Sequence, residues 1–148
     1  MDASFQLYSS RSVPSQELFL QTLSKLGYKS VEGFRGVYGE PQVFLDALDV
    51  AGLTMPSGHV GLAELEEDFA GHLTTASILG IKDVFVPYLP PEQRPDDKDG
   101  YKAGAARLAD LQQRAADIGL RLGWLNHDFE VLPLADGSLP LDIILTEA

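Results

Sequence analysis

The sequence of 148 residues contains no cysteine. This absence excludes disulfide bonds, thiolate metal sites and cysteine nucleophiles, and it is consistent with a reducing compartment, for which we expect the cytoplasm. Basic residues are also scarce, with 11 Lys and Arg against 22 Asp and Glu and a formal net charge of −11. An acidic chain without a cluster of Lys or Arg is poorly suited to bind a nucleic acid.

Long apolar runs are missing as well. Every apolar stretch is interrupted by a charge or a glycine before it reaches the roughly 18 residues that a membrane helix needs. Residues 1–4 lack the basic and apolar regions of a signal peptide. Since 45% of the residues are hydrophobic, we expect one domain over residues 1–148 with a single core and no membrane partner.

One pattern recurs four times: an amphipathic stretch ends in a glycine, and a short β-prone run follows. The four glycines are Gly27, Gly52, Gly80 and Gly119. Glycine at this position adopts the left-handed conformation that ends many helices. With an opening strand at residues 5–8, the pattern predicts the order β-α-β-α-β-α-β-α-β and therefore an α/β fold with a parallel sheet.

Two architectures fit this order. A doubly wound sheet of five strands is complete at this length, and the first five strands of an eight-stranded TIM barrel use the same units. Periodicity alone does not choose between them. In both architectures the chemistry lies beyond the C-terminal ends of the parallel strands.

Candidate site residues follow the predicted strands. The densest group is residues 126–130, where Asn126, His127, Asp128 and Glu130 directly follow an apolar strand. This spacing brings an amide, an imidazole and carboxylates together at the opening of a sheet. Strand parity would place Asn126, Asp128 and Glu130 on one side and His127 on the other, if the strand stayed regular.

Single candidates follow the other strands. His59 follows the third strand and Glu32 the second. A simpler interpretation exists for each, because His59 could bond a loop carbonyl and Glu32 could pair with Arg35.

The longest predicted loop covers residues 87–100 and contains four prolines. Long βα loops often act as lids, whereas prolines also build stiff surface loops. We expect a lid here. No glycine-rich phosphate loop follows the first strand, where residues 9–12 read Ser-Ser-Arg-Ser, and this argues against nucleotide binding.

Several segments resemble the sugar phosphate isomerase/epimerase family, the xylose isomerase-like TIM barrels. The similar segments are residues 5–11, 27–32, 57–60, 126–130 and 141–145. The chain departs from the family pattern at Leu125, where a histidine often stands. The resemblance implies a partial TIM barrel with about the first five of eight strands.

The resemblance also implies an activity in carbohydrate metabolism. The expected enzyme is an isomerase or epimerase that acts on a small sugar, keto-sugar or cyclitol and uses a divalent Mn, Zn or Mg ion for proton abstraction next to a carbonyl. The predicted catalytic residues are Glu130, His127 and Glu32, with Glu130 also the metal ligand. The predicted substrate-binding residues are His59, Asn126, Tyr8 and Arg11.

Other functions stay open at this stage. A dehydratase or lyase begins with the same proton abstraction. The sequence ends at Ala148, about two turns into a predicted helix, and five strands leave two open sheet edges. These features suggest either an inactive fragment or a half-barrel module that pairs with a second copy as a homodimer. An endonuclease of the same superfamily fits poorly with a net charge of −11.

Overall fold

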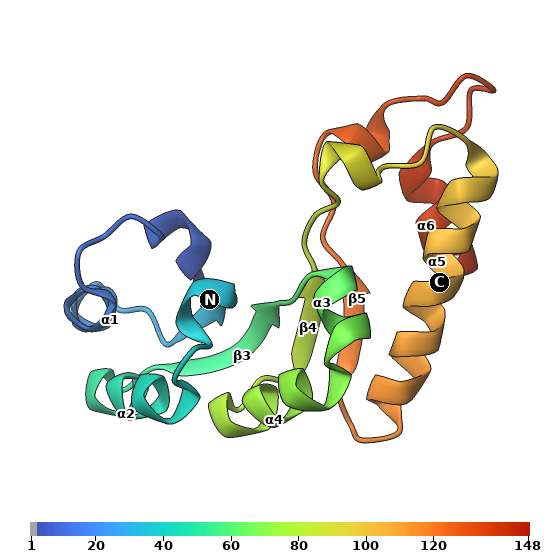
Figure 1. Ribbon diagram of the computed structural model, residues 1–148. Helices are drawn as coiled ribbons and strands as arrows, with labels where there is room; N and C mark the ends of the chain where they lie inside the picture. Colours follow the sequence, from blue (N-terminus) through green and yellow to red (C-terminus); the bar gives the residue numbers. More distant parts are fainter. Residues whose placement is uncertain (1–2) are drawn as a thin grey trace.

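The computed structural model describes residues 3–148. Its sheet consists of five parallel strands in the order β1-β2-β3-β4-β5 (Figure 1). Their bounds are β1 Ser4–Gln6, β2 Ser30–Gly33, β3 Thr54–His59, β4 Asp83–Val86 and β5 Arg121–Trp124. A doubly wound sheet reverses its strand order part of the way along the chain, whereas a barrel keeps sequential order. The order therefore selects the partial TIM barrel and confirms the α/β prediction.

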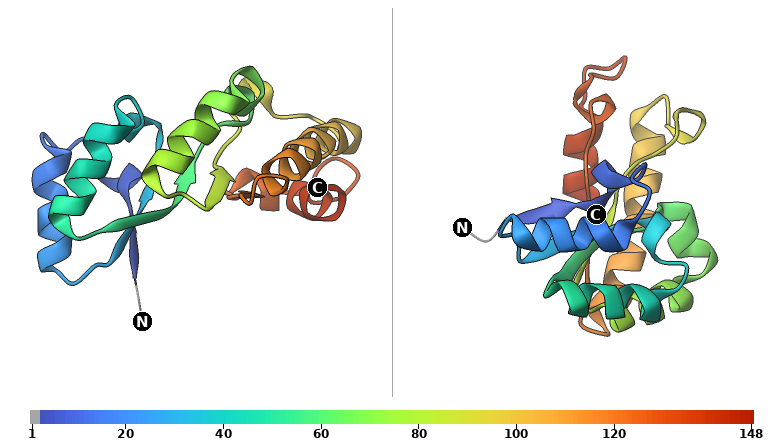
Figure 2. Two further views of the ribbon diagram at one scale, coloured as in Figure 1. Left: turned by 90° about the horizontal axis from the view of Figure 1, so that it is seen from below. Right: turned by 90° about the vertical axis from the view of Figure 1, so that its left-hand side faces the viewer.

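The helices form an outer layer along one side of the curved sheet (Figures 1 and 2). Their bounds are α1 Gln16–Lys25, α2 Pro41–Ala51, α3 Leu62–Glu67, α4 Phe69–Leu79, α5 Lys98–Ala116 and α6 Pro140–Glu147. The short helix α3 lies between β3 and α4, and the sequence pattern did not predict it. No helix of the described residues is long and apolar enough to cross a membrane.

Local sequence signals set the helix ends. The glycines that the repeat singled out, Gly27, Gly52, Gly80 and Gly119, all have positive φ angles, between 67° and 93°. At the other ends, Ser15 and Asp97 cap α1 and α5 through their side chains, and Pro41 is the first residue of α2. The glycine angles confirm the predicted helix ends, and the two caps and the proline fix where these three helices begin.

The first strand is shorter than predicted. Leu7 and Tyr8 lie in a 3-10 turn over Leu7–Ser10 instead of the expected strand over residues 5–8. The Ser10 hydroxyl donates to the Leu7 carbonyl at 2.8 Å, and the Arg11 guanidinium donates to the Tyr8 carbonyl at 2.9 Å. These local bonds use carbonyls that a longer strand would pair with β2, so the chain turns into the region beyond the sheet.

The core lies between the sheet and the helices. Strand residues such as Val31, Met55 and Val86 are buried, and they belong to one cluster with helix residues such as Leu20 and Leu48. This packing fixes where each strand ends. The side chains just past those ends are therefore held in a defined arrangement.

Candidate active site

A cleft of about 630 Å³ lies at the C-terminal ends of the strands. Its lining residues come from β1, β3 and α3 and from the segments that follow β1, β2, β4 and β5. They are Gln6, Tyr8, Phe34, Arg35, His59, Gly61, Glu64, Pro87, Tyr88, Leu125 and His127. The cleft therefore lies where the parallel-strand argument expects the chemistry.

Glu32 is the centre of a hydrogen-bond network beside this cleft. Its Oε1 lies 2.7 Å from Nε2 of His59 and accepts a bond of 3.1 Å from Gln6. Its Oε2 accepts a bond of 2.8 Å from the Ser57 hydroxyl. The three partners come from β1 and β3, on either side of β2, so the strand register positions the network.

The network keeps Glu32 ionised. The bond from His59 lowers the pKa of Glu32 most; burial opposes the shift, and the bonds from Ser57 and Gln6 support it, so that the pKa falls to about 2. An ionised carboxylate only accepts hydrogen bonds, so Nε2 of His59 carries the hydrogen in this contact. The imidazole is 8% exposed in its side chain and lines the cleft.

His127 and Tyr88 form another part of the cleft wall. Their ring centroids are 5.1 Å apart at an interplanar angle of 69°. The Tyr88 hydroxyl accepts a bond of 2.7 Å from Arg94, whose guanidinium lies 3.9 Å from the centroid of Phe129. Arg94 thus ties the loop over residues 87–100 to the segment that carries His127, while the predicted role of this loop as a lid stays a prediction.

Glu130 lies outside the cleft lining. Its side chain is fully buried, Oε1 accepts a bond of 2.9 Å from the Trp124 indole, and Oε2 accepts one of 2.8 Å from the backbone N–H of His127. Strand β5 ends at Trp124 and a 3-10 turn covers Phe129–Val131. The regular strand on which the parity prediction depended therefore does not extend to Glu130, and Glu130 is absent from the cleft lining.

The other predicted substrate-binding residues lie at different places. Tyr8 lines the cleft and is half exposed. Arg11 lies over the Tyr8 ring, 4.4 Å from its centroid, and is not part of the lining. Asn126 is exposed outside the lining and donates to the His127 carbonyl at 3.2 Å. The structure thus brings Tyr8, His59 and His127 to one cleft, with Glu32 bound to His59.

Sequence reasoning assigned no role to Gln6, Ser57 or Glu64. Gln6 and Ser57 reach Glu32 only through the register of neighbouring strands, which a local pattern does not reveal. Glu64 belongs to the unpredicted helix α3 and pairs with Arg35 at 2.9 Å. A further unassigned contact involves Gly58, where an added Cβ would collide with the hydroxyl of Tyr38. Glycine at position 58 therefore leaves room for Tyr38 beneath the site.

The donor set does not form a metal centre by itself. Within residues 3–148 no group of three or more His, Asp or Glu side chains is placed to share an ion. Both oxygens of Glu130, the predicted ligand, are already bound by Trp124 and His127. A divalent ion held by these residues alone would have few protein ligands.

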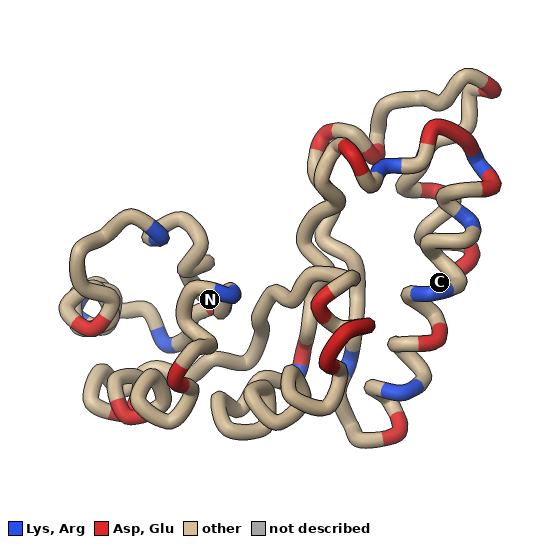
Figure 3. The backbone as a smooth tube through the Cα atoms, in the orientation of Figure 1, with Lys and Arg blue, Asp and Glu red and all other residues tan. Residues whose placement is uncertain are grey.

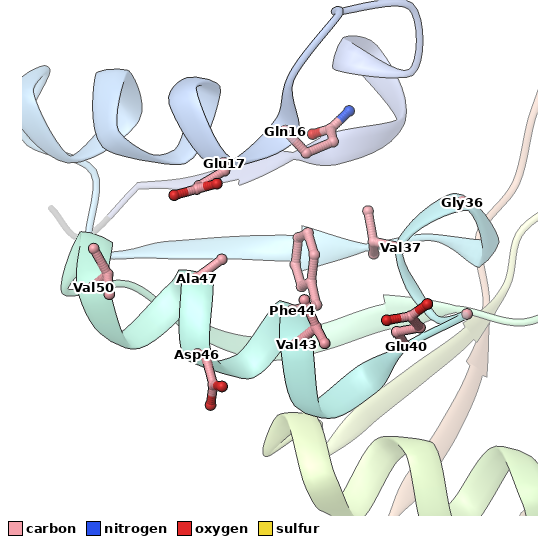
Figure 4. A pocket seen from close by; sticks show the side chains of 11 residues that line it. Gln16, Glu17, Gly36, Val37, Glu40, Val43, Phe44, Asp46, Ala47 and Val50 are labelled. Carbon is pink, nitrogen blue, oxygen red and sulfur yellow. The ribbon is translucent and has the colours of Figure 1, made fainter.

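A second groove of about 700 Å³ lies between α1 and α2 on the helical layer (Figure 4). Val37, Phe44 and Ala47 provide apolar lining, and Glu17, Glu40 and Asp46 add carboxylates. No predicted site residue lines this groove. The carboxylates of the chain are spread over many elements (Figure 3), and the groove lies on the helical layer and not at the C-terminal strand ends.

A curved parallel β/α sheet with strands in sequential order and a cleft at their C-terminal ends is the architecture of TIM barrels. No family model matches the sequence, and no curated protein sequence matches it. Solved structures do match. A sugar phosphate isomerase/epimerase from Parabacteroides distasonis is similar with a TM-score of 0.82 and 20% identity, over 98% of this chain and 60% of that chain.

Two further structures extend this likeness. The IolI protein with a bound zinc atom has a TM-score of 0.68 and 18% identity, over 84% of this chain and 51% of its own. A probable 3-DHS dehydratase, AsbF from Bacillus anthracis, has a TM-score of 0.65 and 13% identity, over 82% of this chain and 51% of its own. The fold is therefore that of the xylose isomerase-like TIM barrels, and the chain spans 60% of the first relative and about half of the other two. The reactions that these names describe differ, so the likeness identifies the fold and not the reaction.

Proposed function

We propose that the chain provides the cleft of an isomerase or epimerase that moves a proton next to the carbonyl of a small sugar, keto-sugar or cyclitol. The observation that carries this proposal is the pair formed by Glu32 and His59 at 2.7 Å, with the imidazole on the cleft wall. The name of the similar structure from Parabacteroides distasonis supports the substrate class.

In this mechanism His59 is the proton carrier. Because Nε2 donates to Glu32, Nδ1 is the ring atom left to accept a proton, and it makes no hydrogen bond within the described residues. An imidazole in this position can remove a proton from the carbon beside a carbonyl and return it on the same face to the carbonyl carbon, while the hydroxyl proton of the deprotonated carbon passes to the carbonyl oxygen. Epimerisation would need a second proton donor on the opposite face of the substrate. The fixed carboxylate of Glu32 stabilises the imidazolium that forms between the two steps, as in other carboxylate–histidine pairs.

Glu32 and Glu130 act as positioning residues in this proposal. A carboxylate with a pKa of about 2 is a weak base, so Glu32 orients His59 better than it removes a proton itself. Glu130 binds the backbone N–H of His127 and so orients the segment whose imidazole lines the cleft. The role of Glu130 as base or metal ligand, which the sequence predicts, would require its two present hydrogen bonds to open.

No step of the mechanism passes through a metal ion. The divalent ion stays a prediction from the family resemblance, which the zinc of the similar IolI structure supports. A dehydratase on a sugar or cyclitol is a second candidate, favoured by the likeness to AsbF. It begins with the same proton abstraction and would use the same His59.

Deuterium exchange tests the proposal. The protein would be incubated in D₂O with D-fructose, D-tagatose or a keto-inositol, and loss of the C–H signal beside the carbonyl would be followed by NMR. We expect exchange with at least one probe and a fall of about 10²–10⁴-fold in His59→Gln, the range that general acid–base groups contribute. His72→Gln is the matched control, because His72 lies on α4 outside the cleft.

Two results would contradict the proposal. One is exchange in His59→Gln at the rate of the unsubstituted chain, and the other is no exchange with any probe. Circular dichroism of each variant checks that it folds. Glu32→Gln provides a second readout, since loss of the carboxylate should shift the pH dependence of exchange and not only its rate.

A further inference from the structure

We infer that the cleft accepts an uncharged ring bearing hydroxyl groups and excludes the phosphate ester of the same sugar. This inference rests on the proposed function and specifies its substrate class. It follows from the charges that line the cleft and from the aromatic rings beside them.

The charge of the cleft opposes an anion. Arg35 is the only Lys or Arg among the lining residues, and its guanidinium pairs with Glu64 at 2.9 Å. The other oxygen of Glu64 accepts a bond of 3.0 Å from the backbone N–H of Gly61 at the start of α3, which fixes the carboxylate beside Arg35. The charges of Arg35 and Glu64 therefore offset each other, and the ionised carboxylate of Glu32 behind His59 adds a negative charge beside the cleft. A phosphate would lose solvation there and gain no unpaired cation.

Two other arginines, Arg11 and Arg94, contact aromatic rings and backbone carbonyls. Arg11 lies over the Tyr8 ring and donates to the Tyr8 carbonyl, and Arg94 donates to the Leu89 carbonyl and lies over Phe129. Neither guanidinium lines the cleft. Each supports an aromatic residue next to it, because a guanidinium over a ring is attracted to the π-system.

The aromatic side chains of the cleft are suited to contact an uncharged sugar ring. Tyr8 is 50% exposed and Tyr88 is 40% exposed, and both line the cleft. Phe34 packs edge-on against Tyr8 with centroids 5.7 Å apart, and His127 packs against Tyr88. These neighbours fix the two tyrosines as rigid surfaces that carry a hydroxyl each. Such surfaces pack against the apolar C–H groups of a sugar, while Gln6, His59 and His127 offer hydrogen bonds to its hydroxyls.

A paired titration tests this inference. D-Fructose and D-fructose 6-phosphate would be added separately to the protein, and the NMR signals of Tyr88 and His127 would report binding. We expect D-fructose to bind about fivefold or more tightly than its phosphate ester at low salt, with the difference shrinking as salt is added. The reverse preference would overturn the inference and leave the proposed function standing. No binding of either probe would also overturn the inference, whereas the proposed function is decided by the exchange test with its three probes.

Substitutions at the ion pair sharpen the test. Glu64→Gln keeps a carbonyl oxygen for the Gly61 N–H but frees Arg35, so it should improve binding of the phosphate ester relative to D-fructose about three- to fivefold. Glu66→Gln is the matched control on the same helix, because Glu66 pairs with Arg107 and does not line the cleft. It should change neither affinity.

Arg35→Gln distinguishes the alternative in which Arg35 anchors a phosphate. Arg35 is 86% exposed in its side chain, so this variant should fold. Under our inference Arg35→Gln weakens binding of the phosphate ester no more than it weakens binding of D-fructose. A selective loss of D-fructose 6-phosphate binding in Arg35→Gln would overturn the inference.

Discussion

The two halves of the sheet each hold a carboxylate in a network, and they hold it differently. At β2, Glu32 receives bonds from Gln6, Ser57 and His59, which lie 25 to 27 positions away along the chain. After β5, Glu130 receives bonds from Trp124 and His127, which lie six and three positions away. The first network exists only when three strands are assembled, whereas the second forms within one loop.

The two networks have different roles: the one around Glu32 positions a side chain in the cleft, and the one around Glu130 stabilises a loop. Glu32 holds the imidazole of His59 on the cleft wall, so its partners include a group suited to chemistry. Glu130 is fully buried and binds a backbone N–H and an indole, so its partners fix the course of the chain. A dense polar motif in a sequence can therefore mark structural support for a site as readily as the reacting groups.

The largest expected loss of stability follows from removing the network around Glu130. Glu130→Ala leaves a cavity at a fully buried side chain and two donors without their acceptor, and we expect the free energy of unfolding to fall by about 2–4 kcal/mol. Urea unfolding followed by the fluorescence of Trp124, the single tryptophan of the chain, measures this change. Asp128→Ala, in the same loop and exposed, should change it by less than about 0.5 kcal/mol. If Glu130→Ala also lowered the free energy of unfolding by less than about 0.5 kcal/mol, Glu130 would not support the structure of this loop.

Lowering the pH should remove the stabilisation that the network around Glu32 provides. The pKa of Glu32 is about 2 in the folded chain against an ordinary value of 4.5, so the unfolded chain binds this proton first as the pH falls. The stabilisation from Glu32 is present above about pH 4.5 and is lost between about pH 4.5 and pH 2. Between pH 6 and pH 3 the loss from this group amounts to about 2 kcal/mol.

The comparison with Glu32→Gln isolates this contribution from other carboxylates. The unsubstituted chain should lose about 2 kcal/mol more free energy of unfolding between pH 6 and pH 3 than the variant does. Glu66→Gln serves as a control, because the Arg107 guanidinium also lowers the pKa of Glu66 but the pair is more exposed, so its pH effect should be smaller. Equal acid sensitivity in the unsubstituted chain and Glu32→Gln would show that the network does not hold the carboxylate ionised.

The fold was largely predictable from local chemistry. The four glycines that end helices and the alternating order of strands and helices depend on a few neighbouring residues, and both predictions are confirmed. Helix α3 was missed because its six residues are too short for a clear period. The strand order that chose between the two architectures depends on long-range pairing, which local patterns do not contain.

The candidate site was predictable only in part. His59, His127 and Tyr8 were found because residues after parallel strands face one edge of the sheet, and all three line the cleft. For Asn126 and Glu130, strand parity predicted a side opposite to His127, but β5 ends at Trp124 and parity no longer applies there. The partners of Glu32 depend on strand register, so Gln6 and Ser57 emerged only from the three-dimensional arrangement.

The smallest expected change in stability comes from Ser57→Ala, which tests whether Ser57 stabilises the ionised form of Glu32. Ser57→Ala removes one donor to the carboxylate and should lower the free energy of unfolding by about 1 kcal/mol at pH 6. It should also raise the pKa of Glu32 toward its ordinary value, because the lost bond stabilised the ionised form. Titration of the Glu32 carboxyl carbon by NMR measures this shift. Ser30→Ala on β2 is the control, because it makes no side-chain contact with Glu32 among the described bonds. If Ser57→Ala lowered stability without moving the pKa, Ser57 would contribute packing alone, and His59 and Gln6 would be left to hold the charge on Glu32.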